Sequence, residues 1–313
     1  MALLLPILRH KQVMDVPNAR SSHVSPVPRG GGIAVAVGIL AAAVAVGLSG
    51  QSVPWIVVVV VMALTGVGFL DDLVGLGSKV RFAAQLCAGL AVGVWLVVAS
   101  PAAGWPGIAF LAVVTLGFAA FVNAYNFMDG INGISALTGL VAGLWFVWVG
   151  HDLDQTALLV LGASTAGACL GFLPWNAPKA WVFLGDSGSY ALGALIVSMA
   201  LYAWAQGAGI LTSSAPLLVY LADTAWALVQ RLRRGAALGE AHRDHIYQRL
   251  VDDGWSHLRS AAVVALVVTV VCGLATLSMG EIVRWVCVSL VLFAYLAFPY
   301  ILGQTRPWAV ATR

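Results

Sequence analysis

The chain has 313 residues, of which 61% are hydrophobic and 9% are charged, and its mean hydropathy is +0.94. This composition excludes an ordinary soluble domain and indicates a polytopic membrane protein. The formal net charge of +3 is too small to indicate a nucleic-acid partner.

The first 32 residues hold no segment that can cross a bilayer. Residues 1–8 are apolar, but a spanning helix needs about 20 residues. They do not resemble a cleaved signal peptide either, because basic residues follow the apolar run and none precede it. Residues 9–32 are polar and rich in Pro, Ser and Gly, and they are predicted to form a loop.

From residue 33 onward, long apolar runs alternate with short polar breaks, as in a chain threaded repeatedly through a membrane. We predict an all-α transmembrane helix bundle that forms a single integral-membrane domain over 1–313. The ten predicted spans are 33–49, 53–70, 82–99, 105–122, 134–149, 156–173, 182–202, 211–230, 261–279 and 282–302.

The basic residues are concentrated in alternate breaks. Of the sixteen Lys and Arg residues, only Arg284 lies outside the breaks at 1–32, 71–81, 123–133, 174–181, 231–260 and 303–313. Positive charge collects on the cytoplasmic side of membrane proteins, so this face, with its N-terminal segment and its large 231–260 loop, is predicted to be cytoplasmic. Three acids fall on the other side and are expected to be solvated: Asp152, Asp154 and Glu281.

The cysteines carry no signal of chemistry. They lie in apolar runs without CxxC spacing, so they are expected to pack as small apolar residues, neither binding zinc nor forming a disulfide framework. They are Cys87, Cys169, Cys272 and Cys287.

Residues 69–73 contain the adjacent acids Asp71 and Asp72 at the C-terminal end of a predicted helix. Two acids there oppose the helix dipole and repel each other, so they favour a bound cation. With Lys79 and Arg81 nearby, the pair suits a divalent metal and phosphate groups. The alternative is a solvated helix end.

The stretch 123–135 is polar although it lies between two long apolar runs. Polar groups near a membrane interior are costly and tend to be functional. The alternative is an ordinary turn rich in Asn and Gly. Its four polar side chains recur every three residues and are predicted to share a helical face until two glycines loosen the backbone: Asn123, Asn126, Asp129 and Asn132.

Two further motifs follow. Asp186, in 183–189, is either a helix N-cap or the third acid of a hard-oxygen set suited to Mg²⁺, with positions left open for substrate phosphates. In 241–249, helical spacing would place His242, His245 and Arg249 on one basic face, which favours anion binding over a solvated loop. No P-loop or Rossmann glycine pattern occurs.

These four motifs, in this order and on one face, resemble the bacterial polyprenyl-phosphate N-acetylhexosamine-1-phosphate transferases. That family is related to the translocase that makes the first lipid intermediate of peptidoglycan. Residues 15–23, 28–32 and 242–249 look most like the branch that initiates O-antigen synthesis. The resemblance covers nearly the whole chain.

The resemblance implies a reaction on the cytoplasmic face of the bacterial inner membrane. Undecaprenyl phosphate would attack the β-phosphate of a UDP-sugar, UDP-GlcNAc or a related UDP-N-acetyl sugar, and release UMP with Mg²⁺ or Mn²⁺ as the metal. The resemblance is also compatible with a homodimer. The implied catalytic residues are Asp71, Asp72, Asp129 and Asp186, with Asp71, Asp72 and Asp186 as metal ligands. The implied substrate-binding residues are Lys79, Asn123, Asn126, Asn132, His242, Arg243, His245 and Arg249.

Two departures from the family pattern are visible. Many relatives have Asp-Gly-x-Asp-Gly where this chain has Asn132 in place of the second acid, so the negative charge that could serve as a base or metal ligand is absent at position 132. The usual N-terminal span is reduced to residues 1–8.

Two other functions remain as alternatives. A transporter or channel also uses acids inside a membrane bundle, but it would place them near the midplane, whereas here only Asp223 lies well inside a predicted span. We interpret Asp223 as a buried structural acid paired with a neighbouring polar group. A non-catalytic lipid-binding scaffold would not need Asp71, Asp72 and Asp186 together.

Overall fold

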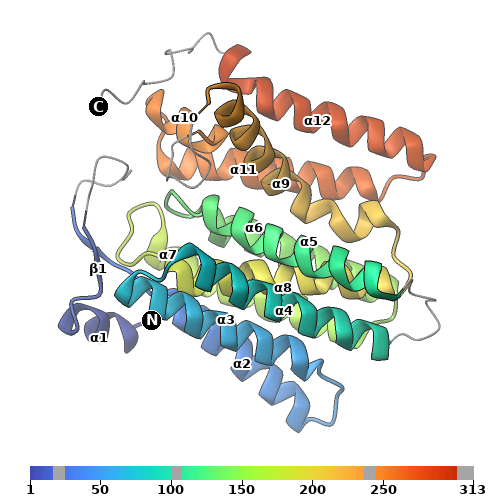
Figure 1. Cartoon of the computed structure of the whole chain (residues 1–313), viewed down its shortest axis with the longest axis horizontal. Helices are drawn as coiled ribbons and strands as arrows, with labels where there is room; N and C mark the ends of the chain where they lie inside the picture. The colour runs from blue at the N-terminus through green and yellow to red at the C-terminus, as the bar shows by residue number, and fades with distance from the viewer. Residues whose placement is uncertain (17–24, 100–106, 236–243, 302–313) are drawn as a thin grey trace.

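The structure is a computed structural model that describes residues 1–16, 25–99, 107–235 and 244–301. Within these residues, ten long helices form a bundle, and successive helices run in opposite directions (Figure 1). Each matches one predicted span, so the predicted all-α bundle is confirmed. They are α2 (Gly32–Leu48), α3 (Trp55–Val74), α4 (Ser78–Ala99), α5 (Gly107–Phe127), α6 (Ile134–Asp152), α7 (Thr156–Asn176), α8 (Gly185–Ala205), α9 (Ile210–Arg233), α11 (His257–Ala275) and α12 (Glu281–Ile301).

The ten helices do not all suit a membrane equally. By length and composition, eight of those in the described part of the chain can cross one. Helix α2 is apolar but has 17 residues. Helix α9 is long enough but more polar, since it carries Asp223, Arg231 and Arg233.

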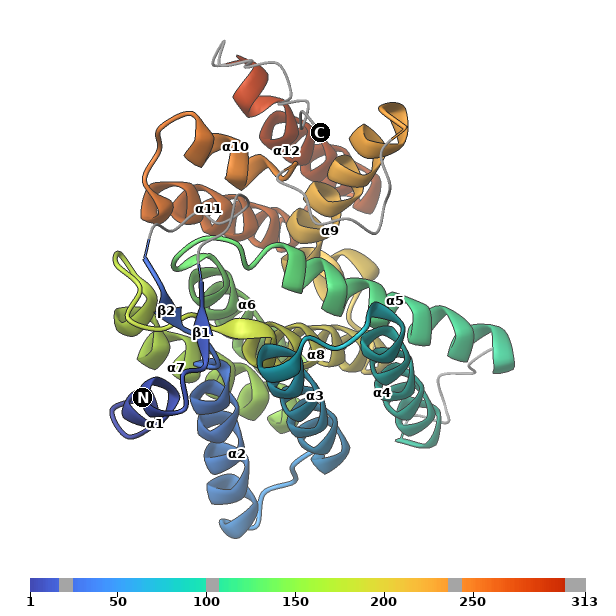
Figure 2. The same ribbon diagram turned by 60° about the vertical axis from the view of Figure 1, so that its left-hand side comes forward.

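Helix α8 is the centre of the bundle (Figure 2). Every residue in 187–200 is buried, and α8 packs against helices on several sides, including α3 and α5. A helix that is apolar all round is expected in a core. The N-terminal end of α8, which carries Asp186, is therefore held in the middle of one end of the bundle.

The N-terminal segment is more ordered than the predicted loop. A short helix, α1 (Leu4–His10), is followed by two paired strands, β1 (Met14–Asp15) and β2 (Val27–Pro28). After β2, the chain runs beside the segment that precedes α8: Phe183 N donates to Pro28 O at 2.8 Å, and Gly31 N donates to Phe183 O at 2.9 Å. The N-terminal segment thereby supports the end of the bundle where Asp186 lies.

The two ends of the bundle differ in charge. Helix α1, the β1–β2 pair and the short helix α10 (Ile246–Asp252) lie at one end, on the left of Figure 1, with the basic breaks. At the opposite end, Asp152, Asp154 and Glu281 are exposed, as predicted for solvated loop charges.

This arrangement predicts opposite labelling of two exposed positions. In a background without Cys87 and Cys287, the two cysteines that are not buried, Gly280→Cys should react with a membrane-impermeant maleimide in spheroplasts. Lys179→Cys should react only after permeabilisation, because its break carries the cytoplasmic charge bias. Labelling at 179 and not at 280 in sealed spheroplasts would reverse the orientation.

Candidate active site

The end of α3 buries both of its acids. Gly75, in the left-handed region with a φ of 66°, ends the helix. The chain turns back there, so that Leu76 N donates to Asp71 Oδ1 at 2.7 Å. Asp71 is 5% exposed and Asp72 is 3% exposed. The alternative of a solvated helix end is therefore wrong.

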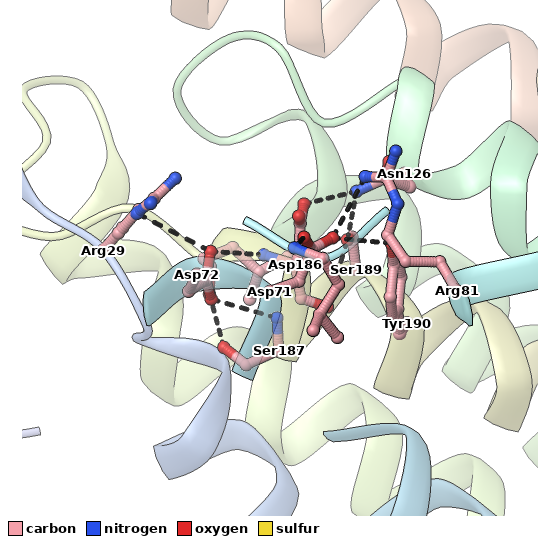
Figure 3. Close-up of polar contacts among 11 residues, drawn as sticks. Arg29, Asp71, Asp72, Arg81, Asn126, Asp186, Ser187, Ser189 and Tyr190 are labelled. Carbon is pink, nitrogen blue, oxygen red and sulfur yellow. Dashed lines mark hydrogen bonds and ion pairs between the residues drawn. The ribbon is translucent and has the colours of Figure 1, made fainter. Parts of the chain in front are cut away.

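Asp72 binds the start of α8. Its two oxygens accept the backbone N–H groups of Asp186, at 3.1 Å, and Ser187, at 3.2 Å (Figure 3). These N–H groups have no partner within the helix, and the helix dipole favours an anion beside them. Arg29 Nε lies 3.9 Å from Asp72 Oδ1. Asp72 thus fixes where Asp186 lies.

A glycine makes this approach feasible. Gly185 has a φ of 74°, and a Cβ there would lie 2.5 Å from Asp72 Oδ2. A side chain at position 185 would therefore be strained and would also push the carboxylate away from α8.

Asp71 faces the other side of the cluster. Arg81 Nη1 lies 3.0 Å from Asp71 Oδ2, and the Tyr190 hydroxyl donates to the same oxygen at 3.2 Å. The carboxyl groups of Asp71 and Asp186 also interact directly. Two neighbouring acids therefore have different partners: a helix N-terminus for Asp72, and Arg81, Tyr190 and Asp186 for Asp71 (Figure 3).

Asn126 completes the cluster from α5. Its Nδ2 donates to Asp186 Oδ1 at 2.7 Å and to Ser189 Oγ at 2.9 Å. The N-cap of α8 is Leu184, and Asp186 lies within the first turn of the helix. The alternative that Asp186 is the N-cap is therefore wrong. The described fold brings Asp71, Asp72, Asn126 and Asp186 together.

The predicted shared face of 123–135 is wrong beyond residue 127, because α5 ends there. Asn123 donates to Gln85 and to Ala119 O, the latter at 2.8 Å. Asn132 donates to Pro178 O at 3.2 Å in an exposed position. The four polar side chains thus have four different surroundings.

Asp129 lies in the turn between α5 and α6 and is partly buried. Burial raises the pKa of its carboxyl, Ser135 lowers it and the charge of Asp72 raises it, so that the pKa lies at about 7.

Two residues of the predicted basic face of 241–249, His242 and Arg243, lie outside the described residues, so this face stays a prediction. His245 precedes α10, is 1% exposed, and its Nδ1 lies 2.9 Å from Asp223 Oδ1. The local spacing is that of a helix start: Gln248 Oε1 accepts the backbone N–H of His245 at 3.3 Å.

Arg249 contacts an aromatic ring: its guanidinium carbon lies over the Tyr300 ring, 5.2 Å from the ring centroid. Asp223 is fully buried and hydrogen-bonded, as predicted for a structural acid with a polar partner. Sequence reasoning did not connect it with His245.

An apolar groove of about 580 Å³ opens between α4, α5 and α9, one turn from the cluster. Lys79 and Asn123 are among its few polar lining residues. Ser78 also lines the groove and lies three residues before Arg81 on α4, so the groove and Arg81 share a face of that helix. The apolar lining includes Phe82, Phe127, Leu221 and Leu228.

The cluster fits Mg²⁺ through two acids. Asp71 and Asp186 face each other, and like charges at this range repel unless a cation or a proton lies between them. Carboxylate oxygens are the ligands that Mg²⁺ takes, usually one or two with substrate phosphates. Within the described residues, no group of three or more His, Cys, Asp and Glu side chains is arranged to hold a metal. Both Asp72 oxygens accept backbone N–H groups. Both Asp71 oxygens accept donors too, so a metal bound to Asp71 would replace some of them.

Two residues of the cluster, Arg29 and Tyr190, are not predicted from the sequence to belong to the site. Arg29 lies in the 28–32 motif, which is a weak signal, whereas Arg81 is expected beside the acids. Tyr190 has no such signal, because it lies inside an apolar span. Asn176 joins two loops of this end: its Oδ1 accepts Gly133 N at 2.6 Å, and its Nδ2 donates to Val182 O at 3.1 Å.

Residues 54–204, which include Asp71, Asp72, Asn126 and Asp186, match glycosyl transferase family 4. The chain is 32% identical to the decaprenyl-phosphate N-acetylglucosaminephosphotransferase of Mycobacterium leprae, over 83% of this chain and 75% of that protein. It is 25% identical to the probable undecaprenyl-phosphate N-acetylglucosaminyl 1-phosphate transferase of Bacillus subtilis, over 85% and 78%. It is 33% identical to a phospho-N-acetylmuramoyl-pentapeptide-transferase of Mycobacterium bovis, over 55% and 62%.

A membrane bundle with an acid cluster at one end is thus accompanied by similarity along most of the chain. The chain belongs to the polyprenyl-phosphate N-acetylhexosamine-1-phosphate transferase family, a group of multi-pass membrane enzymes of glycosyl transferase family 4.

Two glycines of α3 provide a matched test of the cluster's packing. A Cβ on Gly68 would lie 2.6 Å from Ser187 N and closer still to the Asp186 carbonyl, whereas a Cβ on Gly66 would meet nothing within 4 Å. Gly68→Ala should cost about 1–3 kcal/mol of stability through overpacking and displace Asp186. Gly66→Ala should be neutral or slightly stabilising. Melting temperatures in detergent measure both, and equal values would contradict the packing described.

The raised pKa of Asp129 predicts a pH-dependent stability. A carboxyl whose folded pKa is raised contributes stability that is complete below its unfolded pKa, about 3.9. This contribution is lost as the pH rises through about 7. Without divalent metal, Asp129→Asn should therefore gain in melting temperature relative to wild type between pH 5 and pH 8.

Asp152→Asn is the control, because Asp152 is exposed at the opposite end. Its difference from wild type should not change over this range. If wild type instead gains on Asp129→Asn as the pH rises, the ionised form is the favoured one and the burial argument is wrong.

Proposed function

We propose that this protein transfers an N-acetylhexosamine 1-phosphate from a UDP-sugar, such as UDP-GlcNAc, to a polyprenyl phosphate, with undecaprenyl phosphate as the expected carrier. An oxygen of the acceptor phosphate attacks the β-phosphorus of the donor. The bond from that phosphorus to the bridging oxygen breaks, and UMP leaves with the oxygen and the electron pair. The product is a polyprenyl diphosphate sugar.

One observation carries this proposal: an arginine lies at each side of the acid cluster, Arg81 beside Asp71 and Arg29 beside Asp72. Phosphoryl transfer requires mainly that two phosphates be held in line and that their charge be balanced. Guanidinium groups on both sides of the acids suit one phosphate group on each side. Similarity to enzymes named for this reaction supports the same function.

The acceptor side is assigned to Arg81. The apolar groove between α4, α5 and α9 suits an isoprenoid chain, and Lys79 and Asn123 lie where a headgroup would leave it. Arg81, three residues along α4 from the groove-lining Ser78, would then bind the acceptor phosphate together with the metal. The donor side is accordingly that of Asn126, Asp129 and Arg29.

Asp71 is expected to position the acceptor rather than to deprotonate it. Its Oδ1 already accepts Leu76 N, and its Oδ2 accepts Arg81 and Tyr190. A phosphate monoester has a second pKa of about 6, so at neutral pH most of the acceptor is a dianion without help. A general base would contribute little at pH 7.

Asp71 and Asp186 would hold the divalent metal, Mg²⁺ or Mn²⁺. When bound, the metal supplies charge neutralisation between the acceptor and donor phosphates. The chain's own residues do the rest: Asp72 orients the start of α8, Asn126 orients the Asp186 carboxylate, and Arg81 and Tyr190 orient Asp71.

The cellular setting follows from the charge pattern and the relatives. We infer an inner-membrane enzyme with a cytoplasmic active site, acting at the first membrane step of a cell-envelope glycan. The names of the mycobacterial relatives widen the carrier to decaprenyl phosphate, so the O-antigen assignment is one of several glycans that fit.

Release of UMP is the decisive assay. Purified protein should produce UMP in step with a polyprenyl-diphosphate-linked sugar when it is given UDP-GlcNAc, undecaprenyl phosphate and Mg²⁺. Parallel reactions with decaprenyl phosphate, with other UDP-N-acetyl sugars and with Mn²⁺ assign the carrier, sugar and metal. Absence of UMP from every combination would overturn the proposed function.

The variant Asp186→Asn should lose turnover by roughly a hundredfold or more. The amide keeps the shape but removes the charge between the phosphates, and Asn126 can no longer donate to a carboxylate. Asp152→Asn, a change of the same chemistry at the far end, should turn over like wild type. Turnover of Asp186→Asn within a few-fold of wild type would remove Asp186 from the reaction.

A further inference from the structure

A second buried acid lies apart from the cluster. Asp223, in α9, is 0% exposed, and three groups surround it. The Tyr295 hydroxyl donates to its Oδ2 at 2.6 Å, Ile246 N donates to both of its oxygens at 3.2 Å, and His245 Nδ1 lies 2.9 Å from Oδ1. A desolvated carboxylate is retained only where such donors compensate its burial.

Asp223 and its partners belong to three separate elements. Asp223 belongs to α9, His245 and Ile246 to the start of α10, and Tyr295 to α12 (Figure 2). Helix α10 has only seven residues, and a helix this short is marginal without tertiary contacts. Its place is therefore set by what it binds, and Asp223 is the charged group that it binds.

The other side of α10 touches the turn that carries Asp129. Tyr247 donates its hydroxyl to Phe127 O at 2.9 Å, and a Cβ on Gly130 would overlap that hydroxyl. The His245 ring is stacked with Tyr247, with centroids 5.7 Å apart, and lies 6.4 Å from the Phe127 ring. A continuous set of contacts thus leads from Asp223 through His245 and Tyr247 to residues 127–130.

Tyr247 is suited to this link. Burial, and after it the charges of Asp223 and Asp129, raise the pKa of its hydroxyl well above the usual value. The hydroxyl therefore stays protonated and remains a donor to Phe127 O. Asn126, the residue before Phe127 in α5, donates to the Asp186 carboxylate.

We propose that Asp223 is a positioning residue of the transfer reaction: it holds His245 and Tyr247 against residues 127–130 and so keeps Asn126 and Asp129 in place on the donor side of the site. The inference rests on the proposed function for its kinetic meaning. A purely structural Asp223 would change the amount of folded protein and leave the substrate constants alone.

The first test is Asp223→Asn, which keeps the shape and removes the charge. The KM for UDP-GlcNAc should rise about tenfold or more, as expected for loss of an outer-shell partner, while the KM for polyprenyl phosphate stays within about twofold. Ser213→Ala is the matched control, since Ser213 is a buried polar residue of the same helix outside the site. Ser213→Ala should keep the wild-type KM for UDP-GlcNAc and for polyprenyl phosphate.

Hydrogen exchange supplies a readout that needs no substrate. In Asp223→Asn, peptides covering 244–252 and 127–133 should both exchange faster, while peptides from α3 should not change. If the donor KM or the exchange of 127–133 stays at the wild-type value, the inference is overturned. If wild type itself releases no UMP, the proposed function fails, and the exchange of 127–133 still decides whether Asp223 holds that turn.

Tyr295→Phe decides the question if Asp223→Asn cannot be recovered folded. It keeps the ring and removes one donor to the carboxylate. A smaller rise of the donor KM, with faster exchange in 127–133, supports the inference. If the donor KM and the exchange of 127–133 both keep their wild-type values, the inference is overturned.

Discussion

The bond between Asp72 and the first N–H groups of α8 is the contact on which this site depends. It places an anion at the positive end of the most enclosed helix of the described bundle. Hydrogen bonds to a charged group are worth about 1.5–3 kcal/mol each, and an unpaired buried carboxylate would cost more. Because α8 is fixed by packing on all sides, the bond also fixes Asp72, and through it the end of α3.

Fixing α3 and α8 together determines what the neighbouring acids face. Asp71, next along the chain to Asp72, is turned toward Arg81, Tyr190 and Asp186. The charges therefore separate into two sides, with Arg81 next to the apolar groove and Arg29 next to the N-terminal segment. A reaction between a lipid phosphate and a nucleotide diphosphate needs this separation, since the two substrates approach from different phases.

The two sides are also held by different parts of the fold. On the groove side, Lys79, Arg81 and Gln85 lie on α4 itself, so their positions follow from one long helix. On the other side, Asn126 and Asp129 lie at the end of α5 and in the turn after it, where backbone order depends on tertiary contacts such as Tyr247 and Asn176. The positions of Asn126 and Asp129 therefore depend on contacts with distant parts of the chain, whereas Lys79, Arg81 and Gln85 share one helix.

The sequence by itself determined the ten helices, the sorting of charge to one end, the acids Asp71, Asp72 and Asp186, and the family, because apolar length and local motif order are properties of the chain. It predicted Asp223 as a paired buried acid. Only the tertiary structure decided that Asp72 serves α8 while Asp71 faces Arg81, that His245 binds Asp223, and that Arg29 and Tyr190 join the cluster. Hydrogen-bond partners such as Asp72 and Ser187 are 115 positions apart. Local spacing indicates which face a side chain takes on its own helix, but its partner is set by how separate helices pack.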